Sequence, residues 1–423
     1  MPRRIGPAHG PKRPRFVRTR SMALCLMAVG LVLVPATSAG RNMPMASPVA
    51  SVVSTASVPG AGSLSGTWTM FAPTSGQPFA RTGAALAFDP VEGLGVLFGG
   101  RAANSSLLND TWVNDGDYPG EWGSTPVPDI VSPPPLLDAA LTFDPTFNEF
   151  LLFGGKLANG TAYGGTWSFG GFQWTDLTGN LRTSPPPDPS PAIAYDALTG
   201  EVVLVSSSDP GATWTFGAGG WTDLPIAEWL APRTAPTALA DPSTGGVLLF
   251  GGSTIGSEPQ PLNATWMFLS SGWEPVTSGT APPPEARPAM AYDPRIPGVL
   301  LFSSTSTVST WVYTSTGWSE WPGGTMPPAR AGAELYYDSD ADYDSLFGGA
   351  AVNGSTFSDN WGWSVPPVVL TPTLGAASIG FTTWVEVAAV IAVPIAVVLI
   401  LRRRPPRTKP VDAPASAAAA APS

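Results

Sequence analysis

Six repeats run through most of this chain, and their period restricts the folds that it can adopt. Each repeat holds an aspartate at a turn, a run of β-forming residues that ends in two small residues, and a Thr-Trp or Asn-Trp pair a short loop later. The turn aspartates are spaced by 55, 52, 45, 52 and 45 residues: Asp89, Asp144, Asp196, Asp241, Asp293 and Asp338. Such repeats pack against one another because one repeat cannot bury its own apolar face.

The fourth repeat divides into four expected strands, a to d. They span Pro236–Ala240, Val247–Phe250, Ala264–Leu269 and Trp273–Val276. The other repeats divide in the same way, but the sixth repeat lacks a clear strand d. The residues around Trp68 match strand d in sequence, so we expect an N-terminal strand to complete the last repeat and close a ring of six blades. Trp363 is an alternative start for that outer strand.

Four repeats end strand b in LFGG, two of them continue to Asn-Asp-Thr-Trp or Asn-Ala-Thr-Trp, and several repeats open on Pro…Arg. Over residues 65–365, about 70% of the chain, these motifs resemble the kelch-repeat family of β-propellers. The resemblance implies an all-β, six-bladed kelch-type β-propeller. Two repeats depart from it, because Ser206-Ser207 and Ser303-Ser304 replace Gly-Gly and precede short b–c loops.

Both ends of the chain carry membrane signals. Residues 1–39 read as a signal peptide, with basic residues, the apolar run Met22–Val34 and small residues before a cleavage site after Ala39; an uncleaved anchor is the alternative. A flexible spacer is expected over 40–64 and a Pro/Thr-rich stalk over 366–378. We expect a transmembrane helix over 379–401 and a cytoplasmic basic and Ala-rich tail over 402–423. The positive-inside rule then predicts a single-pass plasma-membrane protein whose propeller is extracellular.

The expected propeller is strongly acidic. Residues 65–365 hold 29 Asp and Glu against eight Lys and Arg, a net charge of 8 − 29 = −21. Such a charge repels phosphate backbones and excludes nucleic acid as a partner. The acids either keep a large apolar-cored protein soluble or form an acidic docking surface.

Two residue types are almost absent, which limits the chemistry. Cys25 and His9 are the sole cysteine and histidine, and both lie in the expected signal peptide. A mature chain without them has no disulfide, no thiolate nucleophile, no Ser-His-Asp triad and no common zinc or copper site. Galactose oxidase, which contains a kelch-type propeller, needs His ligands and a Cys–Tyr crosslink, so its copper chemistry is excluded. Glycosidases need only two carboxylates, so that class stays open.

Four arginines stand just before strand a of their repeats: Arg81, Arg233, Arg287 and Arg330. Because strand a starts on the face that carries the b–c loops, they are expected to surround one mouth of the central channel and to bind a ligand there. Kelch propellers that bind acidic peptides use arginines at similar openings. The alternative is that each arginine bonds backbone carbonyls or a neighbouring Asp between blades.

Two further patterns suggest ligands. Asp338, Asp340 and Asp342 alternate at a turn as Ca²⁺ ligands do, but the glycine and acid of an EF-hand are missing, so a long solvated turn is the alternative. No other cofactor is expected. Five Asn-x-Ser/Thr sequons fall in b–c loops as possible glycosylation sites: Asn104, Asn109, Asn159, Asn263 and Asn353.

The sequence thus favours a membrane-tethered extracellular binding or adhesion module without catalytic activity. Its partner would be a protein, peptide or glycan bound on one propeller face, besides the membrane that holds the C-terminal helix. A carboxylate glycoside hydrolase on the same scaffold is the alternative function.

Overall fold

The computed structural model describes residues 66–365, apart from 73–75, 115–121, 125–130, 226–229 and the single residues 210, 271, 278, 297, 306, 323 and 340. The expected signal peptide, spacer, stalk, membrane helix and tail lie outside these residues. Within the described ranges, no helix has both the length and the apolar character needed to cross a bilayer.

Six four-stranded antiparallel sheets, blades 1 to 6, make up the described ranges, and their strands are named a to d from the centre outward. Strand a is β3 (Ala85–Asp89), β8 (Ala140–Asp144), β12 (Ala192–Asp196), β17 (Thr237–Ala240), β22 (Ala289–Asp293) and β26 (Ala331–Asp338). Strand b is β4 (Leu94–Phe98), β9 (Glu149–Phe153), β13 (Glu201–Val205), β18 (Val247–Phe250), β23 (Gly298–Ser304) and β27 (Tyr343–Ala350). Strand c is β6 (Thr111–Asn114), β10 (Thr166–Gly170), β14 (Thr213–Gly217), β20 (Thr265–Leu269), β24 (Val308–Thr314) and β28 (Asn360–Ser364). Strand d is β7 (Gly123–Ser124), β11 (Gln173–Asp176), β15 (Gly220–Leu224), β21 (Gly272–Pro275), β25 (Gly317–Trp321) and β1 (Thr67–Met70). Two short ribbons and a 3-10 helix complete the described elements: β2 (Arg81–Thr82) with β5 (Arg101–Ala102), β16 (Arg233–Thr234) with β19 (Ser253–Thr254), and η1 (Thr178–Asn180).

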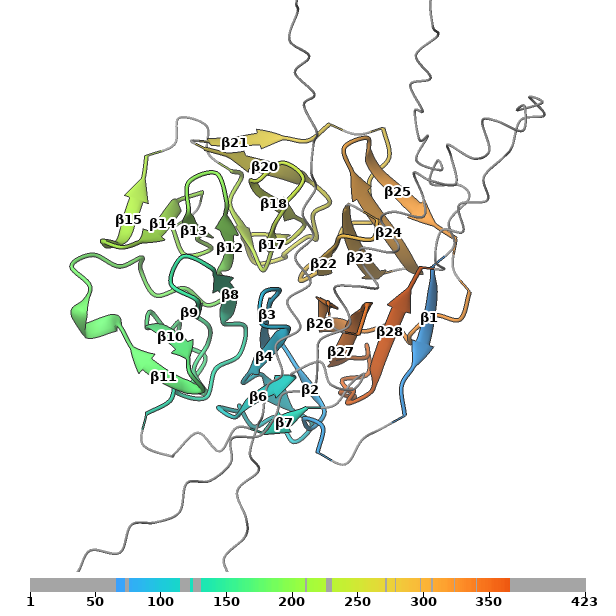
Figure 1. Ribbon diagram of the computed structural model, residues 1–423, viewed down its shortest axis with the longest axis horizontal. Helices are drawn as coiled ribbons and strands as arrows, with labels where there is room; N and C mark the ends of the chain where they lie inside the picture. Colours follow the sequence, from blue (N-terminus) through green and yellow to red (C-terminus); the bar gives the residue numbers. More distant parts are fainter. Residues whose placement is uncertain are drawn as a thin grey trace, which may run out of the picture. The chain divides into compact units, whose positions relative to one another are not determined.

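The blades form a closed ring. Their inner strands contact one another in the cyclic order β3, β8, β12, β17, β22, β26 and back to β3, around a central channel with a volume of about 630 Å³. Figure 1 looks down this ring, with the inner strands gathered at the centre. The all-β, six-bladed propeller expected from the repeats is confirmed.

The N-terminal strand closes the ring as expected. β1 pairs antiparallel with β28, so that Trp68 lies opposite Trp363, and blade 6 reads β1-β28-β27-β26. The alternative, in which Trp363 begins the outer strand, is wrong because Trp361 and Trp363 both belong to β28. The two open edges of the repeat array therefore cover each other, which removes sites for unwanted edge pairing.

Strand b is largely buried in every blade, because neighbouring blades cover both of its faces. Its sequences are continuous apolar runs such as EFLLF in β9 and VLLF in β18, whose central residues are fully buried. A strand that is covered on both faces has no polar alternation, which explains this pattern.

The tryptophan of strand d holds each blade to the blade before it. Its indole N–H donates a hydrogen bond to the hydroxyl of the threonine that directly precedes the strand-c tryptophan of the preceding blade. Five junctions have this bond at 2.8–2.9 Å: Trp174–Thr111, Trp221–Thr166, Trp273–Thr213, Trp318–Thr265 and Trp68–Thr310. In the sixth, Asn360 stands at the threonine position, and the indole N–H of Trp122 has no partner among the described residues. The threonine of the Thr-Trp repeat motif is thus a contact between blades.

The repeated aspartate forms the turn between strands a and b. In five blades its Oδ1 accepts a hydrogen bond from the backbone N–H two residues later, as Asp89 does from Val91 at 2.7 Å. In blade 6, Oδ1 of Asp338 accepts a hydrogen bond from the backbone N–H of Ala341, three residues later, at 3.0 Å. A hydrogen bond from a nearby backbone N–H to an aspartate side chain stabilises a turn.

Candidate functional site at the channel mouth

The two ends of the channel differ. At the end that we call the loop face, the b–c loops of the four Gly-Gly blades rise as hairpins, closed by backbone bonds such as Ala102 to Ser106 and Ala351 to Ser355. Blades 3 and 5, with Ser-Ser, have short loops there. At the other end, the turn face, strands a and b meet at the aspartate turns. The loop face therefore offers the larger and more uneven surface.

Glycine is required where strand b leaves the blade. Gly99 and Gly100 have φ of 67° and 92°. A Cβ on Gly99 would lie 2.9 Å from the Leu136 carbonyl oxygen of the next blade. The left-handed backbone and the close approach together exclude larger residues there.

Three of the four predicted arginines lie between blades rather than in the mouth. Arg81, Arg233 and Arg330 are 1–3% exposed. Each donates through Nε to the carbonyl two residues before it and through a terminal nitrogen to the first glycine carbonyl of its Gly-Gly pair, at 2.9–3.2 Å. These contacts are the blade-junction alternative, so these three side chains do not reach the channel opening.

Two of these arginines also hold the loop that leads to strand c. Arg81 binds both carboxylate oxygens of Asp110 at 2.7 and 2.8 Å, and Arg330 binds Asp359 in the same way. Burial acts to raise the pKa of Asp110, but hydrogen bonds and charge from Arg81 lower it overall. In blade 4, Ala264 stands at the position of the aspartate, and burial without an acid lowers the pKa of Arg233 to about 10.

Arg287 differs from the other three and lies at the mouth. Its guanidinium binds both carboxylate oxygens of Asp138. Asp138 opens blade 2 and Arg287 opens blade 5, which stands opposite in a ring of six. Lys156 adds a contact of 3.2 Å to Asp138. The ion pair therefore spans the loop-face mouth of the channel.

A difference in register, which the sequence shows, separates Arg287 from the rest. Arg81, Arg233 and Arg330 stand eight residues before their turn aspartates, whereas Arg287 and Asp138 both stand six before theirs. Arg287 and Asp138 have φ of 55° and 62°, and each donates its backbone N–H to the preceding blade, at Ala235 and Gly83 respectively. Grouping the four arginines by residue type and general position therefore misses the different offset of Arg287. It also does not identify Asp138 as a residue of the channel mouth.

The same junction position carries an acid in the two Ser-Ser blades. Asp188 is fully buried and accepts from the Ser206 hydroxyl at 2.9 Å and the Ser207 N–H at 2.6 Å. Glu285 accepts from the Ser304 N–H at 3.4 Å, and burial raises its pKa to about 7. A glycine carbonyl oxygen accepts a hydrogen bond, so an arginine, which donates, stands opposite Gly-Gly in three blades. A serine hydroxyl can donate a hydrogen bond, so an acid, which accepts, stands opposite Ser-Ser in two blades.

All five sequon asparagines are exposed, and they fall into two groups. Asn104, Asn159 and Asn353 occupy equivalent hairpin tips on the neighbouring blades 1, 2 and 6, where each side-chain oxygen accepts the N–H two residues later at 3.0–3.1 Å. Asn109 and Asn263 stand where the loop enters strand c. Glycosylation at these positions stays a prediction.

The predicted Ca²⁺ ligands belong to a different network. Asp338 forms its turn, and Asp340 lies outside the described residues. The Asp342 carboxylate accepts from the Tyr337 hydroxyl at 2.8 Å and lies 3.8 Å from Arg295. Within the described ranges, no three Asp, Glu, His or Cys side chains are grouped as metal ligands. Ca²⁺ binding therefore stays an untested expectation.

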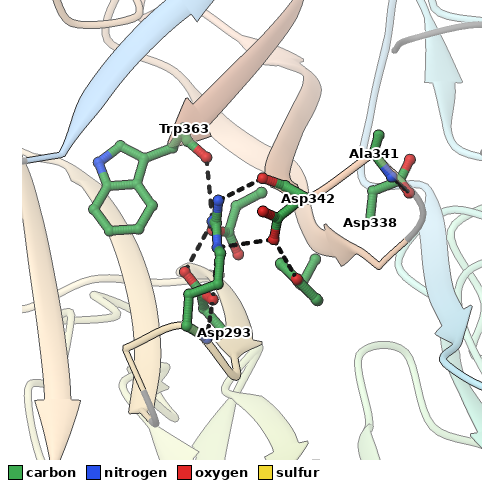
Figure 2. A network of polar contacts seen from close by, with 8 residues as sticks. Asp293, Asp338, Ala341, Asp342 and Trp363 are labelled. Carbon is green, nitrogen blue, oxygen red and sulfur yellow. Dashed lines mark hydrogen bonds and ion pairs between the residues drawn. The ribbon is translucent and has the colours of Figure 1, made fainter. Parts of the chain in front are cut away.

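Arg295 is the centre of this network and joins blades 5 and 6. Figure 2 labels Asp293, Asp342 and Trp363, which belong to the same network. It binds Asp293 at 2.9–3.0 Å, Asp344 at 2.6 Å and the carbonyl oxygen of Asp342 at 2.6 Å. Burial, together with the neighbouring Asp293, raises the pKa of Asp344 well above its usual range. Because both aspartates are fully buried, we assign this cluster to blade packing.

Comparisons with known proteins leave the family open. No protein-family model matches the chain, and no curated protein matches it. Among solved structures, the protein YjhT is similar, with 11% sequence identity over 67% of this chain and 95% of that one and a TM-score of 0.49. A similarity at this level carries no information about function.

Proposed function

We propose that this chain is a membrane-tethered, extracellular propeller of kelch type that binds a protein, peptide or glycan on its loop face without catalysing a reaction. The observation that carries the proposal is the loop face itself. Four hairpins surround a mouth closed by an ion pair, and exposed apolar side chains lie on or beside them: Phe79, Ile255 and Val352. Scattered apolar residues are ordinary on a surface, but their presence at loop tips around a concave centre favours recognition.

Site-specific photo-crosslinking tests where a partner binds. A photoreactive residue at Val352, on the loop face, should crosslink a partner in the native cell envelope. The matched control is Val91, which is also an exposed valine but lies on the turn face. Crosslinking from Val91 alone, or from neither position, would reject the loop face as the binding surface.

Protease treatment of intact cells tests the membrane orientation, which rests on the sequence signals at both ends. Added protease should remove residues 65–365 and leave a small fragment that contains Arg402–Arg404. If the protease leaves the propeller intact, the extracellular assignment is rejected. This outcome does not depend on the result of the crosslinking experiment.

One pair of side chains favours the alternative, a carboxylate glycosidase. Asp138 is held by Arg287 and Lys156. Burial raises the pKa of the nearby Glu334 to about 8, with smaller opposing effects from Arg287 and Asp138. One charged and one neutral carboxyl are what glycoside hydrolysis requires. The bidentate ion pair leaves Asp138 3% exposed, so we rank this function second. Turnover of chromogenic glycosides that is lost in Glu334→Gln would reverse the order.

A further inference from the structure

The central channel has a lining of small side chains and free backbone groups. Each inner strand is the last strand of its sheet, so one row of its N–H and C=O groups is unpaired and faces the channel. Four residues before each turn aspartate, the blades carry Ala85, Ala140, Ala192, Thr237, Ala289 and Glu334. Glu334 is thus the one ionisable side chain at this level of the described channel.

The channel is barred at one end. At the loop face, the Asp138–Arg287 ion pair spans the opening. The lining at the turn face includes Pro90, Pro145, Pro242 and Pro294, together with the half-buried rings of Phe88, Tyr195, Tyr292 and Tyr337. A small ligand would therefore enter from the turn face and meet aromatic and apolar groups first.

Glu334 lies deep in this channel. It stands four residues before Asp338, about 13 Å from the turn face at 3.3 Å per strand residue. It has no hydrogen-bond partner among the described residues. Its carboxyl keeps contact with the channel space, but protein surrounds it, and this burial raises its pKa to about 8. The nearest charges are those of Arg287 and Asp138, which form an ion pair with each other. Arg287 lowers the pKa of Glu334 and Asp138 raises it, so their effects oppose each other.

We propose that the channel binds a small organic amine, entering from the turn face, with its primary ammonium group against Glu334 and its apolar stem along the alanine-rich wall. An ammonium has three N–H donors, which suit one carboxylate and the free carbonyl oxygens of neighbouring inner strands. The net charge of −21 favours cations and repels anions. A lysine side chain on a folded partner is too short to reach this depth, so the ligand is a free molecule.

The ligand enters at the turn face, opposite the proposed partner surface, and this proposal does not depend on that function. Glu334 would ionise when the amine binds, so binding should release a proton near neutral pH. A ligand that bound without contacting Glu334 would release no proton.

Calorimetry of the full-length protein with n-butylamine at pH 7 tests the proposal. Two buffers of different ionisation enthalpy report proton release. We expect saturable binding with proton release, none for n-butanol or butyrate, and an affinity about 30-fold lower or worse in Glu334→Gln, because that change removes the buried charge partner. The matched control Glu320→Gln, an exposed acid of strand d in blade 5, should bind as the wild type does.

Three results would overturn the proposal: no binding of n-butylamine to the wild type, unchanged affinity in Glu334→Gln, or binding of butyrate in place of the amine. Circular dichroism and melting of Glu334→Gln confirm that the variant is folded. Loss of the photo-crosslink at Val352 with intact amine binding would reject the proposed function alone.

Discussion

Replacing Trp68 with alanine tests how the ring is closed. Trp68 is 2% exposed, packs edge-on against Phe302 with ring centroids 5.5 Å apart, and donates to Thr310 at 2.9 Å. Phe302 and Thr310 belong to blade 5, more than 230 residues away in sequence. Removing a buried tryptophan ring costs about 3–5 kcal/mol of unfolding free energy. That is a large part of the net stability of a typical domain, about 5–15 kcal/mol.

Urea unfolding of the full-length protein, followed by circular dichroism, measures this cost. Met70→Ala is the matched control, because Met70 lies on the same strand but is 56% exposed. Trp68→Phe keeps most of the ring and loses the indole N–H, so about 1 kcal/mol of the effect should belong to the hydrogen bond. Deletion of residues 65–72 should destabilise at least as much as Trp68→Ala, whereas deletion of 46–56 should not. Equal, small effects of Trp68→Ala and Met70→Ala would refute closure through β1.

Two further substitutions test the blade junctions. Arg330→Ala leaves Asp359 and the Gly348 carbonyl without their buried donor and should cost about 3–5 kcal/mol, whereas Arg182→Ala, at an exposed arginine, should cost less than about 0.5 kcal/mol in the same urea titration; equal costs would contradict the junction role. Burial raises the pKa of Glu285 from 4.5 to about 7. Its contribution to stability is therefore full below pH 4.5 and lost as the pH rises through 7. The melting temperature of Glu285→Gln should fall less between pH 5 and pH 8 than that of the wild type, and an identical fall would show that Glu285 does not carry this pH dependence.

The repeat pattern in the sequence was sufficient for the architecture. The turn aspartates, the apolar strand b and the Thr-Trp pairs are local signals in the sequence, because each recurs at a fixed place within a repeat. Even the closure through Trp68 could be predicted, since the sixth repeat lacked an outer strand that the N-terminus supplied. The expected strand b of the fourth repeat, Val247–Phe250, matches β18 residue for residue.

The candidate site depended on tertiary structure. A shift of two residues along strand a moves a side chain about 7 Å, from a buried blade junction at Arg330 to the channel mouth at Arg287. Residue type alone cannot distinguish a blade-junction arginine from one at the channel mouth, although the number of residues between the arginine and the turn aspartate differs. The pairing of Asp138 with Arg287 joins blades that are opposite in the ring and 149 residues apart. The environment of Glu334 likewise exists only when six inner strands enclose it, because burial of a carboxyl is a property of the closed ring and not of its own repeat.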